Sequence, residues 1–93
     1  MLKSFKCKET QKLWMKGESR KLAHDMQRVA LRKLAFLNDA LLLNNLRTYP
    51  GNRLEALKGN RAGQYSIRIN DQWRMCFRWD EGSVYDIEIV DYH

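Results

Sequence analysis

Apolar residues in the first half of the chain recur at the spacing of an α-helix. Between residues 21 and 38 they fall three or four positions apart, which places them on one helical face: Leu22, Met26, Val29, Ala30, Leu34 and Leu37. This spacing predicts a helix over residues 21–38, with Ser19 as its N-cap. An earlier helix is expected over Lys8–Lys16, because good helix formers fill this segment and Gly17 follows as a stop.

After residue 52 the hydrophobic pattern changes to alternation. Residues 65–69, 73–79 and 85–89 carry apolar side chains at every second position, as half-buried strands do. The apolar sets are Tyr65, Ile67 and Ile69; Trp73, Met75, Phe77 and Trp79; and Tyr85, Ile87 and Ile89. Turn-forming residues at 44–45 and 49–52 are expected to end the helical half, and a shorter strand is expected at 53–57. Turns at 70–72 and 80–83 would make hairpins, and Trp73 and Trp79 would lie in the core.

The loop at residues 70–72 fixes the register of the hairpin around it. If both apolar sets face one core, Ile69 lies opposite Trp73, and Arg68 then lies opposite Arg74 on the other face of the sheet. Like charges in this position repel each other by up to about 1 kcal/mol. A sheet that keeps two arginines side by side is suited to binding an anion.

The chain is basic, and its charge is unevenly distributed. Its 93 residues include 17 Lys and Arg and 11 Asp and Glu, a net charge of +6. Residues 1–61 carry 14 basic and 5 acidic groups (net +9), and residues 62–93 carry 3 and 6 (net −3). This balance fits a polyanionic partner, and by charge alone it fits a merely soluble basic protein equally well. The cations of the second helix, including Arg28, Arg32 and Lys33, fit either a solvated surface or contacts with RNA phosphates or an acidic partner.

Length and composition exclude several classes of protein. The chain is long enough for one domain, residues 1–93. Its longest apolar run covers residues 40–43, and the N-terminus lacks the apolar stretch of a signal peptide, so we expect a cytoplasmic protein without a membrane segment. Cys7, Cys76, His24 and His93 do not have the spacing of zinc ligands, which predicts free thiols and neither a metal site nor a cofactor.

The sequence carries no phosphate-binding loop, metalloprotease motif, nucleophile elbow or obvious recognition helix. RNA cleavage without a metal needs only a base, cations that stabilise the phosphorane, and an acid for the leaving 5′-oxygen. The chain contains candidates for these roles: Glu55, Lys58, Arg61, Arg68, Arg74, Tyr92 and His93. The ending Asp91-Tyr92-His93 combines groups capable of proton transfer, although an exposed and idle terminus has the same appearance.

Residues 50–77 (PGNRLEALKGNRAGQYSIRINDQWRMCF) strongly resemble the HigB branch of the RelE/ParE toxin superfamily. The ending at 87–93 (IEIVDYH) and the Leu-x-Ser-Phe opening at 2–5 are also similar, so the resemblance covers essentially the whole chain. It implies an α+β fold in which two N-terminal helices pack on a twisted antiparallel β-sheet. It further implies a toxin of a type II toxin–antitoxin pair that cleaves messenger RNA in the ribosomal A site without a metal.

The same resemblance implies partners and site residues. The partners would be the 70S ribosome with its A-site mRNA and a HigA-like helix–turn–helix antitoxin, and operator DNA would be bound only through the antitoxin complex. The expected catalytic residues are those at matching positions, together with Glu55, which stands where better-known members carry histidine: Glu55, Lys58, Arg74, Asp91, Tyr92 and His93. The expected RNA-binding residues are Arg28, Arg32, Lys33, Arg61 and Arg68. A ParE-like gyrase-inhibiting toxin and a non-catalytic RNA- or partner-binding module remain alternatives.

Overall fold

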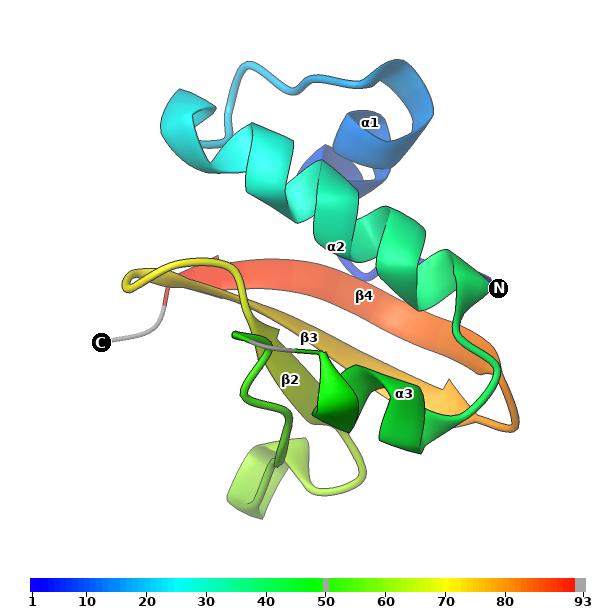
Figure 1. The fold of residues 1–93 in the computed structure, drawn as a ribbon. Helices are drawn as coiled ribbons and strands as arrows, with labels where there is room; N and C mark the ends of the chain where they lie inside the picture. Colours follow the sequence, from blue (N-terminus) through cyan, green and yellow to red (C-terminus); the bar gives the residue numbers. More distant parts are fainter. Residues whose placement is uncertain (50, 92–93) are drawn as a thin grey trace.

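The computed structural model describes residues 1–49 and 51–91, in which helices precede a β-sheet. The helices are α1 (Lys8–Lys16), α2 (Gln27–Asp39) and α3 (Leu43–Thr48), with a 3₁₀ turn at His24–Met26 before α2. The strands are β1 (Glu55–Ala56), β2 (Tyr65–Arg68), β3 (Trp73–Asp80) and β4 (Ser83–Asp91), and a second 3₁₀ turn, Gly59–Arg61, follows β1. Helices α1 and α2 lie together on one side of the sheet (Figure 1). None of the helices in the described part of the chain combines the length and hydrophobicity that a membrane crossing requires.

The four strands form one antiparallel sheet in the order β1-β2-β3-β4. In the hairpin of β2 and β3, Arg68 pairs with Arg74, and the Ile69 N–H donates to the Trp73 carbonyl at 2.9 Å. The predicted register is therefore confirmed. At the far side of the sheet the N-terminal segment runs parallel to β4, with bridges from Leu2 to Val84 and from Phe5 to Ile87. The N-terminal segment thereby covers part of an edge that would otherwise expose unpaired backbone groups.

A β-bulge interrupts the alternation in β4. The register with β3 shifts between Cys76 and Arg78, so that Asp86 and Ile87 lie opposite a single residue of β3. Asp86 occupies the left-handed region with φ +54°, a conformation that Asp adopts more readily than most residues. The extra residue turns Tyr85 to the exposed side of the sheet. The expectation that Tyr85 shares the core face with Ile87 is therefore wrong.

The core lies between the helices and the sheet. Its fully buried apolar side chains come from both layers: Leu13, Met26, Ala30, Leu34, Leu37, Leu46, Ile67, Met75, Phe77, Val84 and Ile87. Trp73 and Trp79 are partly buried and pack against this cluster, in agreement with their predicted place. The helical and alternating patterns thus identified most of the core, and the predicted fold class is confirmed.

The second helix begins later than the sequence pattern predicts. Ala23 has extended dihedral angles (φ −54°, ψ 125°), and α2 itself begins at Gln27. The Gln27 side-chain amide donates to the carbonyls of Ser19 at 2.6 Å and Leu22 at 3.0 Å, which satisfies backbone acceptors in the loop. The Ser19 hydroxyl donates instead to Glu9 at 2.6 Å, so its predicted role as N-cap is wrong.

The segment at residues 44–45 forms helix α3, although its two asparagines predicted a turn. Asn45 stabilises the start of this helix, since its side-chain oxygen accepts the Leu42 N–H at 2.9 Å. Leu46 is fully buried in the core. Burial of this leucine and the local side-chain bond together outweigh the weak helix propensity of asparagine.

Candidate active site

A cleft of about 220 Å³ lies on the face of the sheet opposite α1 and α2. Its lining comes from the segment before β1, from β1, and from the hairpin of β2 and β3: Arg53, Glu55, Arg68, Asn70, Asp71 and Arg74. The two arginines that the register places side by side are both part of this lining. The cleft therefore brings together three guanidinium groups and two carboxylates.

Arg74 is held firmly in this cleft. The residue is only 5% exposed, and its Nε donates to the Ser66 hydroxyl at 2.9 Å. Its Nη2 donates to the Arg53 carbonyl at 2.7 Å and lies 3.8 Å from a carboxylate oxygen of Glu55. Because hydrogen bonds made by charged groups are strong and directional, these contacts fix the guanidinium plane. Arg74 is thus a preorganised cation, as the predicted catalytic role requires.

Arg68 completes the pair and is more accessible than Arg74. Its side chain is 30% exposed and forms an ion pair with Asp71 in the hairpin loop. Glu55 is half-exposed beside Arg74. The two carboxylates reduce the repulsion among the arginines and leave the cleft open to an anion.

The loop before β1 shapes one wall of the cleft, and sequence analysis did not single it out. Arg53 has φ +47°, in the left-handed region that non-glycine residues seldom occupy. Asn52 beside it is fully buried, and its backbone carbonyl accepts the Arg68 N–H at 2.6 Å. Its side chain donates to the Leu46 carbonyl at 3.1 Å and accepts a hydrogen bond from the Lys33 ammonium. The sequence signal for this segment was the turn-forming composition of residues 49–52, which predicts a turn but not a wall of a cleft.

The predicted RNA-binding residues of α2 do not share one surface. Arg28 and Arg32 are exposed, and Arg28 lines a separate hollow with His24 and Glu18. Lys33 is only 8% exposed and points into the molecule, so its predicted place on a surface that contacts RNA is wrong. Burial lowers the pKa of Lys33, and the charges of Arg32 and Arg68 lower it further.

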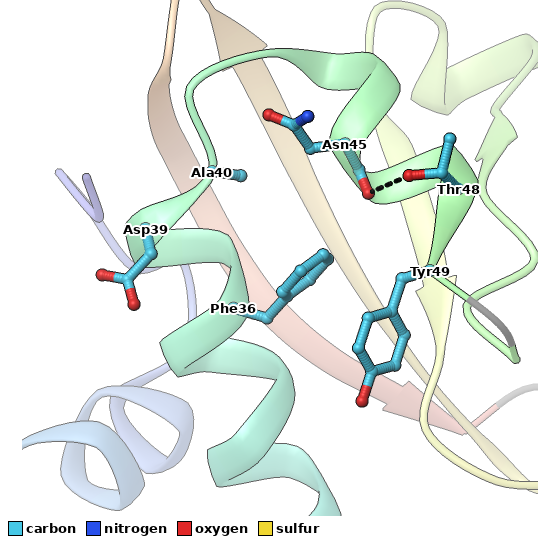
Figure 2. Close-up of a pocket in the computed structure, with 6 residues that line it drawn as sticks. All are labelled: Phe36, Asp39, Ala40, Asn45, Thr48 and Tyr49. Carbon is cyan, nitrogen blue, oxygen red and sulfur yellow. Dashed lines mark hydrogen bonds between the residues drawn. The ribbon is translucent and has the colours of Figure 1, made fainter.

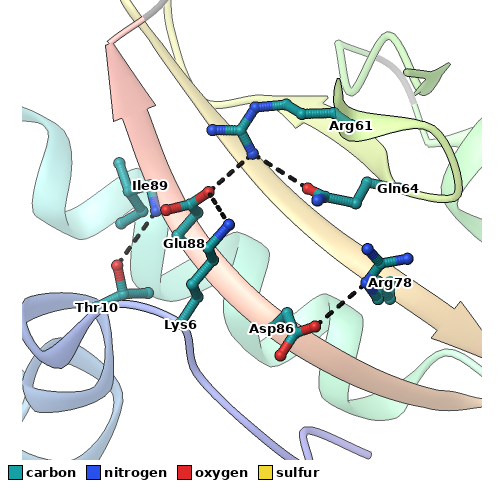
Figure 3. A network of polar contacts seen from close by, with 8 residues as sticks. All are labelled: Lys6, Thr10, Arg61, Gln64, Arg78, Asp86, Glu88 and Ile89. Carbon is teal, nitrogen blue, oxygen red and sulfur yellow. Dashed lines mark hydrogen bonds and ion pairs between the residues drawn. The ribbon is translucent and has the colours of Figure 1, made fainter. Parts of the chain in front are cut away.

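Arg61 belongs to a network of ion pairs on the sheet rather than to the cleft (Figure 3). It donates to Glu88 at 2.8 Å and to Gln64 at 3.1 Å, and Lys6 lies 3.9 Å from the same Glu88 carboxylate. The hydrogen bond to Glu88 raises the pKa of Arg61. The positive charge of Arg61 is therefore largely compensated within the protein.

The end of the chain approaches the cleft from β4. Val90 pairs with Arg74 and Asp91 pairs with Trp73, so the last described residues lie one strand away from the arginine pair. Asp91 is exposed and accepts a hydrogen bond from Gln72 Nε2 at 3.2 Å. The predicted catalytic residues Tyr92 and His93 lie outside the described residues.

Lys58 and the potential metal ligands stand apart from this lining. Lys58 is exposed and immediately precedes the 3₁₀ turn that follows β1. Cys7 and Cys76 are free thiols, and burial raises the pKa of Cys76. Among residues 1–49 and 51–91, no three His, Cys, Asp or Glu side chains gather in a way that would hold a metal ion.

A further pocket of about 400 Å³ lies between α2 and α3 (Figure 2). The rings of Phe36 and Tyr49 line it, with centroids 4.6 Å apart and planes tilted by 47°. The Lys33 ammonium lies 4.9 Å from the centroid of the Tyr49 ring, at a distance typical of a cation–π contact. Lys33 thus connects the aromatic pair to Asn52 in the loop before β1.

Comparison with known proteins identifies the family of this chain. A family model for the RelE-like toxin of type II toxin–antitoxin system HigB matches residues 3–93. Toxin HigB-1 of Vibrio cholerae is 41% identical over 63 residues, which cover 68% of this chain and 66%, just under two thirds, of that protein. Endoribonuclease HigB of Proteus vulgaris is 33% identical over 100 residues that span all of both chains.

Solved structures share the fold at lower sequence identity. The YoeB–YefM toxin–antitoxin complex of Staphylococcus aureus matches with a TM-score of 0.62 and 21% identity, covering 100% of this chain and 98% of that one. YafQ of E. coli matches with a TM-score of 0.59 and 11% identity, covering 98% and 91%. The family predicted from residues 50–77 and from both ends of the chain is confirmed. This protein belongs to the HigB-like family of RelE-like toxins of type II toxin–antitoxin systems.

Proposed function

We propose that this toxin is a ribosome-dependent endoribonuclease that cleaves messenger RNA without a metal. The observation that carries the proposal is the cleft, in which Arg53, Arg68 and Arg74 surround space for one phosphate beside the Glu55 carboxylate. The name of the full-length relative from Proteus vulgaris, Endoribonuclease HigB, supports the same activity.

The proposed reaction is attack of the ribose 2′-oxygen on the adjacent phosphorus. A base removes the 2′-OH proton, the bond from O2′ to phosphorus forms, and the bond from phosphorus to O5′ breaks as an acid protonates O5′. The products carry a 2′,3′-cyclic phosphate and a free 5′-OH. Arg74 and Arg68 stabilise the negative charge of the phosphorane, with Lys58 as a further cation nearby in sequence. Glu55 and the terminal group Asp91-Tyr92-His93 provide the two proton transfers.

The ribosome is the proposed partner that positions the substrate. A cleft of about 220 Å³ accommodates little more than one phosphate with its sugar, whereas a single nucleic-acid-binding module buries roughly 600–1,000 Å² of its surface. A 70S ribosome with mRNA in its A site supplies the missing contacts, and exposed cations such as Arg28 and Arg32 favour this approach. Such a toxin acts in the cytoplasm.

The second proposed partner is the antitoxin. Membership of a type II toxin–antitoxin family implies a proteic antitoxin. We propose that it is a HigA-like helix–turn–helix protein, through which alone the toxin associates with operator DNA.

The test uses purified 70S ribosomes programmed with a defined message. We expect new ends within the A-site codon that carry a 2′,3′-cyclic phosphate and a 5′-OH. The naked message should remain intact, and so should a programmed message with a 2′-deoxy nucleotide at the cleavage site. Equal cleavage of naked RNA, or no cleavage at all, would contradict the proposal. A DNA supercoiling assay with gyrase then tests the ParE-like alternative, for which inhibition would be decisive.

A further inference from the structure

Lys33 is a buried cation that the proposed reaction does not use directly. Its side chain extends from α2 to the loop before β1, and the residue is 8% exposed. Within residues 1–49 and 51–91, no carboxylate forms an ion pair with it. A buried ammonium without an anionic partner usually costs several kcal/mol of folding free energy. Since an apolar residue of the same length would avoid this cost, stability alone does not explain the lysine.

The ammonium is hydrogen bonded to a buried residue in the loop that forms one wall of the cleft. Lys33 Nζ donates to the side-chain oxygen of Asn52, and Asn52 is fully buried. The backbone carbonyl of Asn52 accepts the Arg68 N–H at 2.6 Å, just beyond the region where β1 pairs with β2. Lys33 is therefore linked through Asn52 to the backbone of an arginine that lines the cleft.

The same contact constrains the second arginine. Arg53 follows Asn52 directly and is held in the left-handed region at φ +47°. Its carbonyl accepts the Arg74 Nη2 at 2.7 Å. A residue in this region remains there only when its surroundings enforce the conformation. The residue directly before it, Asn52, is the one to which Lys33 is hydrogen bonded.

We propose that Lys33 is a positioning residue of the active site: by hydrogen bonding to Asn52 it holds the loop at residues 52–53 in the shape that places the Arg68 and Arg74 guanidinium groups around the RNA phosphate. This inference rests on the proposed ribonuclease function. The burial of Lys33, whose ammonium hydrogen bonds to Asn52 and lies over the ring of Tyr49, argues against direct contact with RNA. A misplacement of a catalytic group by about 1 Å can reduce a rate 100-fold, so a distant hydrogen bond is sufficient for a large effect.

The test compares Lys33→Met with Lys16→Met in the complete protein. Lys16→Met removes the same charge from the exposed end of α1, away from the described cleft, and serves as the matched control. Methionine at position 33 keeps most of the length of the stem and removes the donor. On programmed ribosomes we expect kcat of Lys33→Met to fall about 10- to 100-fold with little change in KM, because the bound message is present but poorly oriented. Lys16→Met should retain the wild-type kcat.

A second measurement reports on position and not on activity. The Arg68 amide is protected from hydrogen exchange by its bond to the Asn52 carbonyl. Lys33→Met should accelerate exchange at this amide while the Ile69 amide, bonded to Trp73 within the hairpin, stays protected. The variant Lys33→Gln keeps a donor without the charge, and it should recover part of both the protection and kcat. It also replaces Lys33→Met if that variant does not fold.

The outcomes separate this inference from the function on which it rests. If the wild-type protein does not cleave programmed mRNA, the proposed function fails, and hydrogen exchange still tests the positioning role. If the wild-type protein cleaves and Lys33→Met cleaves equally well, the inference is overturned. A loss of kcat with unchanged protection of Arg68 would also overturn it, since Lys33 would then act by another route.

Discussion

Replacing Arg74 with lysine should damage both the stability and the activity of this toxin. Arg74 donates from Nε to Ser66 and from Nη2 to Arg53, in two directions that one ammonium cannot serve together. Losing one hydrogen bond from a charged donor in a buried site costs about 1.5–3 kcal/mol. Because the residue is only 5% exposed, water cannot readily replace the lost donor. We therefore expect Arg74→Lys to lower the free energy of unfolding by roughly 1.5–3 kcal/mol.

The effect on cleavage should be larger than the effect on folding. Loss of one preorganised donor to transition-state charge typically costs about 10²–10³-fold in kcat. Urea unfolding gives the first quantity, and single-turnover cleavage on programmed ribosomes gives the second. The control is Arg78→Lys on the same strand, where an exposed pair with Asp86 at 3.2 Å contributes at most about 1 kcal/mol. If Arg74→Lys behaves like Arg78→Lys in both assays, the two hydrogen bonds of the buried Arg74 guanidinium do not organise the cleft, and the reasoning fails.

Three further predictions concern the chain terminus and two buried groups. Replacing His93 with alanine should reduce cleavage about 10²–10⁴-fold while antitoxin binding and Tm stay nearly unchanged, and a variant with normal cleavage would remove His93 from the catalytic group. In the folded protein a thiol reagent should modify Cys7 well before Cys76, since Cys76 is 3% exposed and burial raises its pKa; equal labelling rates would contradict this burial. Burial also lowers the pKa of Lys33, so the folded state binds this proton less tightly than the unfolded chain does. The stability of the wild type relative to Lys33→Met should consequently rise as the pH increases toward the ordinary pKa of lysine, about 10.4, as urea unfolding at a series of pH values can show.

The sheet was predictable because its evidence is local. Alternation over residues 65–79 and a three-residue loop determine which side chains share a face, and they led to the observed pairing of Arg68 with Arg74. A bulge has no such signature. It adds one residue at Asp86 and moves Tyr85 to the other face, and nothing in the spacing of the apolar residues reveals it. The pattern of β4 is compatible with both registers, and the packing of neighbouring strands decides between them.

The helices show a similar limit. The spacing of Leu34 and Leu37 identified the buried face of α2, but tertiary contacts determine where the helix begins. The Gln27 side chain hydrogen bonds to the carbonyls of the preceding loop, and α2 begins at this residue instead of at residue 21. The side chain of Lys33 was expected at the surface, yet it lies three residues after Ala30 and four before Leu37, beside the apolar face. Lys33 becomes buried through its contact with Asn52 in the loop at residues 52–53, which the spacing of apolar residues does not reveal.

The distribution of charge along the chain likewise predicts a basic protein but not where it would bind RNA. The helical half has the larger positive charge, whereas the candidate cleft draws on Arg53, Arg68 and Arg74. Arg61 lies between Arg53 and Arg68 in the sequence, but in the folded chain its charge is neutralised by an ion pair with Glu88. Binding of an anion is therefore favoured where guanidinium groups outnumber the carboxylates beside them. In this fold that condition is met by the loop at residues 52–53 and the hairpin of β2 and β3, and the contacts of Asn52 join the two.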